Sequence, residues 1–226
     1  MPRRFILISR WLLFFCCAGW LLPVHAWSFL NDRSGTHVPA VGKLLVAMPG
    51  LDSPRFSATV ILLLRYSPAG AAGLIINRPT RITLAAEFEG QISESQSREA
   101  LFWGGPVEMD KRLMLVEKSA GVESSETLVP VLETLYLTND LSQLQQPQDQ
   151  RSPRFRIFAG YAGWTRSQLE REIENGDWLV LPGTVERVLQ ADTRAIWPQL
   201  IYPQRGRIAA SSINPGQVSL RVAFAR

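Results

Sequence analysis

The chain has 226 residues, of which 46% are hydrophobic and 19% are charged. These values exclude an intrinsically disordered chain, and the length suffices for one domain whose core needs neither disulfides nor a metal ion. The formal net charge is +4, but it is unevenly distributed. Residues 1–26 hold three arginines, residues 204–226 hold four, and neither segment has an acidic residue, which leaves 17 basic and 20 acidic residues in 27–203. The body therefore has a charge of −3 and lacks the basic character of a nucleic-acid-binding domain, so no nucleic-acid partner is expected.

Residues 1–26 have the pattern of a secretory signal peptide or a membrane anchor. Arg3, Arg4 and Arg10 precede or border an uncharged apolar run over 11–22, and Ala26 ends a small-residue cleavage motif. We therefore expect an exported protein, either periplasmic or anchored in the inner membrane. Contact with the membrane is expected only through this segment.

Cleavage after Ala26 would leave a chain without cysteine and with His37 as its only histidine. His37 lies in a polar linker over 27–40, where a solvated role is expected. Disulfides, thiol nucleophiles and cysteine-based zinc sites are thereby excluded from the cleaved chain. We expect no cofactor and no metal, and the sequence offers no catalytic residue by motif.

Short apolar runs bounded by Gly or Pro predict strands in the domain at 41–203. They cover 43–48, 58–64, 73–76, 101–103, 112–116, 134–137, 155–159 and 178–181, with 58–64 and 73–76 forming a hairpin. Short helices are predicted over 82–88, 166–175 and 184–190, and loops over 89–98 and 142–153. Pro198 leaves 195–202 ambiguous, and the basic C-terminal tail at 204–226 has an alternating pattern over 218–224 that is typical of a strand. Because strands outnumber helices, we expect an α+β fold with a mostly antiparallel sheet or partly closed β-barrel flanked by short helices.

The helix at 166–175 carries the clearest local signals. Thr165 and Gln168 have the spacing of a capping box, which predicts Thr165 as the N-cap. Leu169 and Ile173 are four residues apart and form a buried stripe. Gly176 follows as the expected terminating residue.

Four of these segments, taken in order, resemble the YqgE/AlgH family. They are LLVAMPGLDSPRF (Leu44–Phe56), AAGLIINRP (Ala71–Pro79), WGGPV (Trp103–Val107) and GYAGWTRSQLEREIENGDWL (Gly160–Leu179). The resemblance covers about residues 41–200, and the leader and the tail depart from it. It implies a compact AlgH-like fold of a sheet with flanking helices, an activity that is not established, and a cytoplasmic location as the alternative to export. Some members of the family are labelled regulators of transcription or exopolysaccharide production.

Six residues at predicted strand ends or strand-to-helix junctions form a candidate binding surface, which we call the turn cluster: Asn77, Arg78, Gly104, Gly105, Tyr161 and Trp164. Loops on a rigid sheet often carry binding residues, and Arg78 would supply a cation to a protein partner or small anionic ligand. The alternative is purely structural, because Asn and Gly suit turns and close backbone approach.

Two functions remain open at this stage. The first is a non-catalytic binding or regulatory module that acts through the turn cluster. The second is an enzyme, for example a hydrolase, with a carboxylate-based site among Glu170, Glu172, Glu174 and Asp177. The lack of a recognisable nucleophile motif favours the binding module.

Overall fold

The computed structural model describes residues 38–119, 127–144, 154–165 and 167–212, with the backbone alone described over 204–212. The expected leader at 1–26, most of the linker and the expected strand at 218–224 lie outside these ranges. The described strands are β1 Lys43–Ala47, β2 Val60–Ser67, β3 Gly70–Ile75, β4 Pro79–Thr83, β5 Ala100–Trp103, β6 Val107–Glu117, β7 Val129–Pro130, β8 Leu135–Thr138, β9 Phe155–Trp164 and β10 Trp178–Pro182. The helices are α1 Leu84–Glu87, α2 Glu94–Ser97, α3 Gln168–Glu174, α4 Val185–Val188 and α5 Thr193–Ser212, with a 3₁₀ turn, η3, at Leu141–Leu144.

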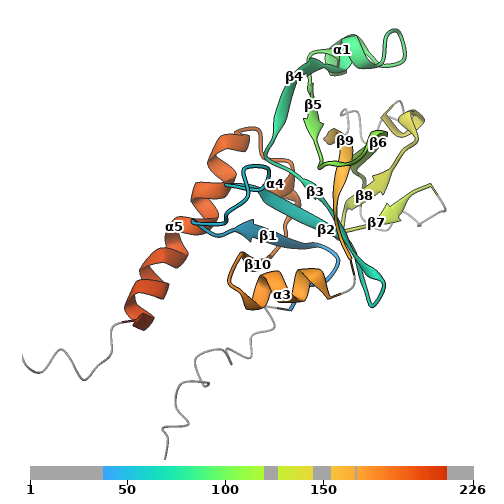
Figure 1. The fold of residues 1–226 in the computed structure, drawn as a ribbon. Helices are drawn as coiled ribbons and strands as arrows, with labels where there is room; N and C mark the ends of the chain where they lie inside the picture. The colour runs from blue at the N-terminus through green and yellow to red at the C-terminus, as the bar shows by residue number, and fades with distance from the viewer. Residues whose placement is uncertain (1–37, 120–126, 145–153, 166, 213–226) are drawn as a thin grey trace, which may run out of the picture. The chain divides into compact units, whose positions relative to one another are not determined.

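The strands form one curled, 10-stranded sheet with the order β10-β1-β2-β3-β9-β6-β8-β7 (Figure 1). The neighbours along this order are antiparallel, and the predicted hairpin is the β2–β3 pair. The antiparallel β4–β5 pair branches from the sheet through a parallel pairing of β5 with β9, which places Phe102 opposite Phe158. This arrangement confirms the expected α+β fold with a mostly antiparallel, partly closed sheet.

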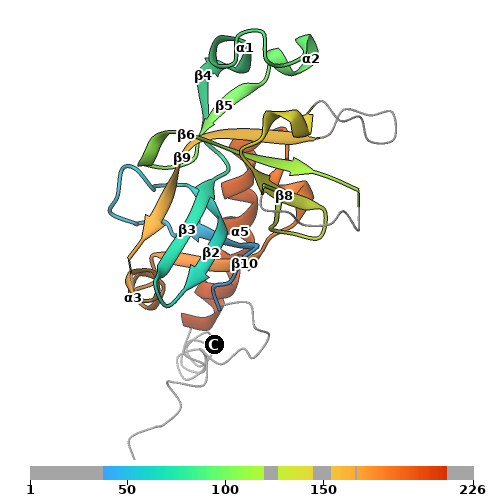
Figure 2. The same ribbon diagram turned by 90° about the vertical axis from the view of Figure 1, so that its right-hand side faces the viewer.

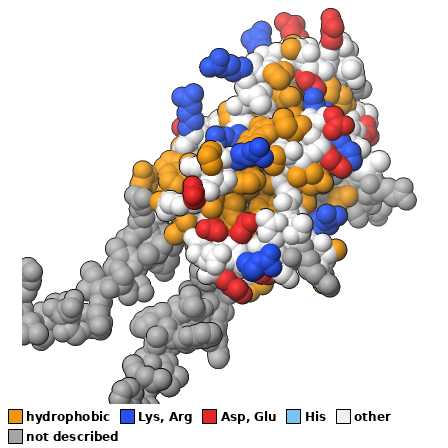
Figure 3. Space-filling model, in the orientation of Figure 1, with side chains coloured by type: hydrophobic (Ala, Val, Ile, Leu, Met, Phe, Trp, Pro, Cys, Tyr) orange, Lys and Arg blue, Asp and Glu red, His pale blue; other side chains and the backbone are white. Residues whose placement is uncertain are grey.

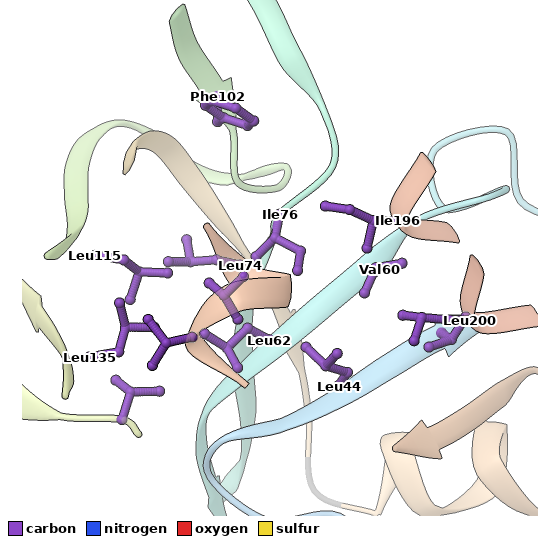
Figure 4. Packing of buried hydrophobic residues seen from close by; sticks show 14 of the residues in the cluster. Leu44, Val60, Leu62, Leu74, Ile76, Phe102, Leu115, Leu135, Ile196 and Leu200 are labelled. Carbon is purple, nitrogen blue, oxygen red and sulfur yellow. The ribbon is translucent and has the colours of Figure 1, made fainter. Parts of the chain in front are cut away.

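Apolar residues on β1 alternate between two faces of the sheet. Leu44 and Val46 belong to a cluster that includes residues of α4 and α5, whereas Leu45 and Ala47 join a second cluster with Leu169 of α3. Figure 4 shows the first cluster, and Figure 2 shows α5 running along the sheet. Burial on both faces explains why the central strands are continuous apolar runs rather than alternating ones.

The segment at 195–202, which the sequence leaves ambiguous, is part of α5. This helix continues past the expected domain boundary at 203 and contains Pro198 and Pro203. Proline removes a backbone donor, so tertiary contacts have to offset the loss. Ile196 and Leu200 are buried in the core, and Trp197 donates its indole N–H to the carbonyl of Ala47 at 2.8 Å.

Two other boundaries also differ from the prediction, one because of side-chain hydrogen bonds and one because of strand pairing. The expected loop at 89–98 contains α2, where Ser93 and Gln96 form a capping box and Gln96 also donates to the carbonyl of Leu144. Strand β9 extends beyond 159 to Trp164, because Ala71 to Gly73 of β3 pair with this extension.

No helix within the described ranges is long and apolar enough to cross a membrane.

The predicted start of α3 is wrong by two residues. Its N-cap is Ser167, which has a left-handed φ of 58°, rather than Thr165. Half of the capping box is present, since Gln168 Oε1 accepts from the backbone N–H of Thr165 at 3.1 Å. The Thr165 hydroxyl also donates to Gln168 Oε1, so it is not used as a backbone acceptor in the predicted way. Gly176 follows the helix with a φ of 81°, which confirms the predicted end.

Glycines allow β9 to touch the turn between β5 and β6. A Cβ at Gly104 would lie 2.2 Å from the Gly160 carbonyl oxygen, and one at Gly105 would lie 2.2 Å from the Tyr161 carbonyl carbon. Gly105 and Gly160 also have φ values of 151° and 66°. These positions confirm that the Gly104-Gly105 turn is built for close backbone approach.

We expect Gly105→Ala to destabilise the domain by about 2–4 kcal/mol, because it adds a backbone clash and an unfavourable φ. Gly163→Ala, also next to Tyr161, is the matched control. A Cβ at Gly163 meets its nearest atoms at 3.5 Å, so this variant should stay within about 0.5 kcal/mol of the parent. Denaturant unfolding measures the stability of both variants. Equal unfolding midpoints would contradict the close backbone contact between the Gly104-Gly105 turn and β9, which we call the glycine crossing.

Candidate functional site

Asn77 ties the end of β3 to the start of β2. Its Oδ1 accepts from the backbone N–H of Val60 at 2.9 Å, and its Nδ2 donates to the carbonyl of Ala58 at 2.9 Å. Ala58 has a left-handed φ of 53°, so the amide side chain stabilises a strained turn. Both polar atoms of the Asn77 side chain are therefore used to stabilise this turn, which is a structural role.

Backbone hydrogen bonds bring the turn that contains Arg78 beside the glycine crossing. The N–H of Trp103 donates to the carbonyl of Arg78 at 2.9 Å, and the N–H of Gly104 donates to the carbonyl of Ala159 at 2.9 Å. The N–H of Ile75 donates to the carbonyl of Gly104 at 3.0 Å. The fold thus gathers Asn77, Arg78, Gly104, Gly105 and Tyr161 around one junction of β3, β5 and β9.

Trp164, the last member of the turn cluster, lies farther along β9 and is only 7% exposed. It packs edge-on against Trp178, with 6.1 Å between ring centroids, and it faces the cluster beneath α3. The structure therefore places Trp164 in the core beside α3, away from the junction that gathers the other five residues.

Arg78 is half-buried, and its Nη2 donates to the carbonyl of Ser57. It takes part in none of the ion pairs formed by the described residues. The Ser57 contact restricts the guanidinium, whose charge has no carboxylate partner in the part of the chain that the structure describes. Figure 3 shows basic and acidic side chains interspersed around apolar ones on one face of the molecule, so that face carries no large field of one sign.

Two of the four carboxylates considered for an enzymatic site, Glu172 and Glu170, have structural partners. Glu172 Oε2 accepts from the indole N–H groups of Trp164 and Trp178, each at 2.8 Å, and its Oε1 accepts from Gln168. Glu170 accepts from the hydroxyl of Tyr66 at 2.8 Å, and this hydrogen bond raises the pKa of Tyr66. Within the described ranges, no group of three His, Cys, Asp or Glu residues could hold a metal ion.

Arg156, which is not among the residues predicted from the sequence, is a buried arginine on β9 that is 6% exposed. Its Nη1 donates to the carbonyls of Ile76 at 2.9 Å and Val188 at 2.6 Å, and its Nη2 donates to the carbonyl of Gln190 at 2.8 Å. The guanidinium carbon lies 4.3 Å from the centre of the Phe102 ring. A single arginine inside the apolar run at 155–159 was the available signal, because a buried charge in a strand needs specific partners.

Arg156 has carbonyl partners but no ion pair among the described residues. Burial lowers its pKa to about 10, so the guanidinium stays protonated at pH 7, and the field of Glu99 opposes this shift. Three of its five N–H groups are used in the carbonyl bonds, which leaves Nε–H and one Nη2–H without an acceptor in the described chain.

Arg156 lines a pocket of about 500 Å³. Aromatic and aliphatic side chains form much of its wall, including Phe102, Phe155 and Ile157. Arg154 also lines the pocket, but its Nε and Nη2 donate to the two carboxylate oxygens of Glu117 at 2.6 and 2.9 Å. Arg156 is therefore the lining cation whose charge has no carboxylate partner among the described residues.

The AlgH-like family model matches residues 44–209. The chain belongs to the AlgH-like family. The match extends beyond the expected limit of the resemblance at about residue 200 and includes much of α5. Among relatives of this AlgH-like protein, a UPF0301 protein of Myxococcus xanthus is 36% identical over 157 residues, which cover 68% of this chain and 84% of the relative. A UPF0301 protein of Streptomyces coelicolor is 32% identical over 182 residues, which cover 79% and 94%.

Two solved structures are similar to this AlgH-like chain. A protein of Corynebacterium diphtheriae has a TM-score of 0.62 and 26% identity, with coverage of 74% of this chain and 88% of that one. The solution structure of the AlgH protein from Pseudomonas aeruginosa has a TM-score of 0.56 and 25% identity, with coverage of 81% and 95%. These likenesses support the family and the fold and assign no activity.

Proposed function

We propose that this AlgH-like protein is a non-catalytic binding or regulatory module whose turn cluster binds an acidic group on a protein partner. The observation that carries the proposal is Arg78, a guanidinium restricted by the Ser57 carbonyl and without an ion pair in the described chain. A partner's carboxylate would gain a charge-assisted hydrogen bond, typically worth about 1.5–3 kcal/mol.

Rigidity of the surrounding backbone supports the same proposal. Asn77 fixes the turn before Arg78, and Gly104 is hydrogen bonded to both β3 and β9. Binding to a preformed surface costs less conformational entropy than ordering a loop. Tyr161 is half-buried at this junction and adds an amphipathic ring of the kind enriched at interfaces.

The enzyme alternative has less support. A carboxylate-based hydrolase needs an acid and a base free to reach substrate. Glu172 is instead occupied by two indoles and Glu170 by Tyr66.

We expect Arg78→Ala to fold normally and to lose the partner, because it removes the cation and one exposed hydrogen bond. The full chain carrying an affinity tag would be cross-linked in its native host, and the captured proteins compared between variants. Arg171→Ala, which removes an exposed arginine of α3, is the matched control and should capture the same proteins as the parent. Thermal unfolding should show both variants within about 2–4 °C of the parent.

A protein captured by the parent and by Arg171→Ala, but not by Arg78→Ala, would identify the partner. If Arg78→Ala captures every protein that the parent captures, the turn-cluster proposal fails. Arg78→Lys adds a second criterion, because it keeps the charge and loses the planar fork. It should restore capture in part.

The location that we propose is outside the cytoplasm, because residues 1–26 combine a basic start, an apolar run and a cleavage motif. Fusion of residues 1–40 to a reporter that is active only after export should give an active reporter. The matched control replaces Leu12 and Leu13 with arginine, which should abolish export. A parent fusion as inactive as this control would favour the cytoplasmic alternative.

A further inference from the structure

We propose that the pocket lined by Arg156 binds a small molecule in which a carboxylate or phosphate group is joined to a planar apolar body. This site is additional to the turn cluster, since none of the six turn-cluster residues lines it. Charge, free hydrogen-bond donors and the apolar wall each support this ligand class.

The charge of Arg156 provides the first argument. A buried cation is costly unless an anion or a set of hydrogen bonds compensates it. Carbonyl oxygens solvate this guanidinium but carry no formal charge. The exposed carboxylate of Glu99 lines the same pocket without forming an ion pair with Arg156. An anionic ligand would supply the missing counter-charge in a site of reduced dielectric constant.

The free donors provide the second argument. Every fully buried side-chain nitrogen or oxygen in the described chain has a hydrogen-bond partner. Because Nε of Arg156 has no acceptor among the described residues, it is not fully buried, and Arg156 lines the pocket. The corresponding Nε and Nη2 of Arg154 hold both oxygens of Glu117, which illustrates how this fork binds a carboxylate.

The pocket wall provides the third argument. A volume of about 500 Å³ is within the range of small-molecule sites. Phe102 lies against the guanidinium, and Phe155, Ile157 and Leu189 extend the apolar surface. A planar apolar body would pack against these side chains. Glu99 at the same pocket disfavours a highly charged polyphosphate and favours a ligand with one anionic group.

Isothermal titration calorimetry on the full chain would test the site with phenyl phosphate and benzoate as the phosphate and carboxylate probes. At least one should bind saturably with a Kd below about 1 mM. Benzyl alcohol, which keeps the ring without the charge, should bind at least about tenfold more weakly. Absence of saturable binding for both anions, or equal binding of benzyl alcohol, would overturn the proposal.

Two variants locate the binding without removing Arg156. Ala191→Phe places a ring into the pocket from an exposed position and should abolish binding, whereas Ala69→Phe, in the exposed β2–β3 turn, should not. Glu99→Gln removes an exposed negative charge and should tighten binding by about threefold. Should Ala191→Phe fail to fold, the affinity of Glu99→Gln decides, and an unchanged value would overturn the site.

Arg78→Ala separates this inference from the turn-cluster proposal. The variant should bind the anionic probe with the affinity of the parent, because Arg78 does not line the pocket. Loss of probe binding in Arg78→Ala would place the anion at the turn cluster and overturn the separate site.

Discussion

The guanidinium of Arg156 joins three parts of the fold that are distant in the sequence. Its acceptors lie just past the end of β3, at the last residue of α4 and two residues beyond that helix. Phe102 of β5 covers its face. One side chain on β9 therefore holds two sheet segments and the α4 region in fixed relation. The turn-cluster residues other than Trp164 and part of the pocket wall lie where β3, β5 and β9 meet, so both depend on this relation.

The glycine crossing makes that junction possible. Gly105 and Gly160 let the backbone between β5 and β6 touch β9, where a Cβ would meet main-chain atoms. This contact positions Phe102 in register with Phe158 through the parallel β5–β9 pairing. Phe102 can then lie on Arg156, so the backbone packing and the buried cation are parts of one arrangement. Phe102 and Phe158 both belong to the apolar cluster of Figure 4, which labels Phe102 at the edge of the group.

Features with local causes could be predicted from the sequence. The Gly104-Gly105 turn needs only glycine's steric freedom, and Gly176 ends α3 for the same reason. Arg156 could not be assigned partners, because its acceptors are backbone carbonyls 80, 32 and 34 residues away, and carbonyls carry no residue-specific signal. The two indoles on Glu172 were missed similarly, since a surface helix with several glutamates predicts a solvated face.

Tertiary contacts also explain why the predictions for Pro198 and Trp164 differ from the structure. Pro198 argues locally against a helix, yet the core contacts of Ile196 and Leu200 place it inside α5. Trp164 carried the pattern of a junction residue, but its indole hydrogen bond to Glu172 and its contact with Trp178 draw it into the core. In each case a contact between distant residues decides the outcome, and a single sequence does not display that contact.

The most direct test of this account is the free energy of unfolding of Arg156→Met, compared with that of Arg154→Met. The first variant leaves three carbonyls without their donor and should be less stable than the parent by about 3–5 kcal/mol. The second variant changes the residue directly before β9 and loses an exposed ion pair with Glu117. Its stability should change by at most about 1 kcal/mol. Equal stabilities of the two variants would contradict the role assigned to Arg156 as the link between β9, β3 and α4.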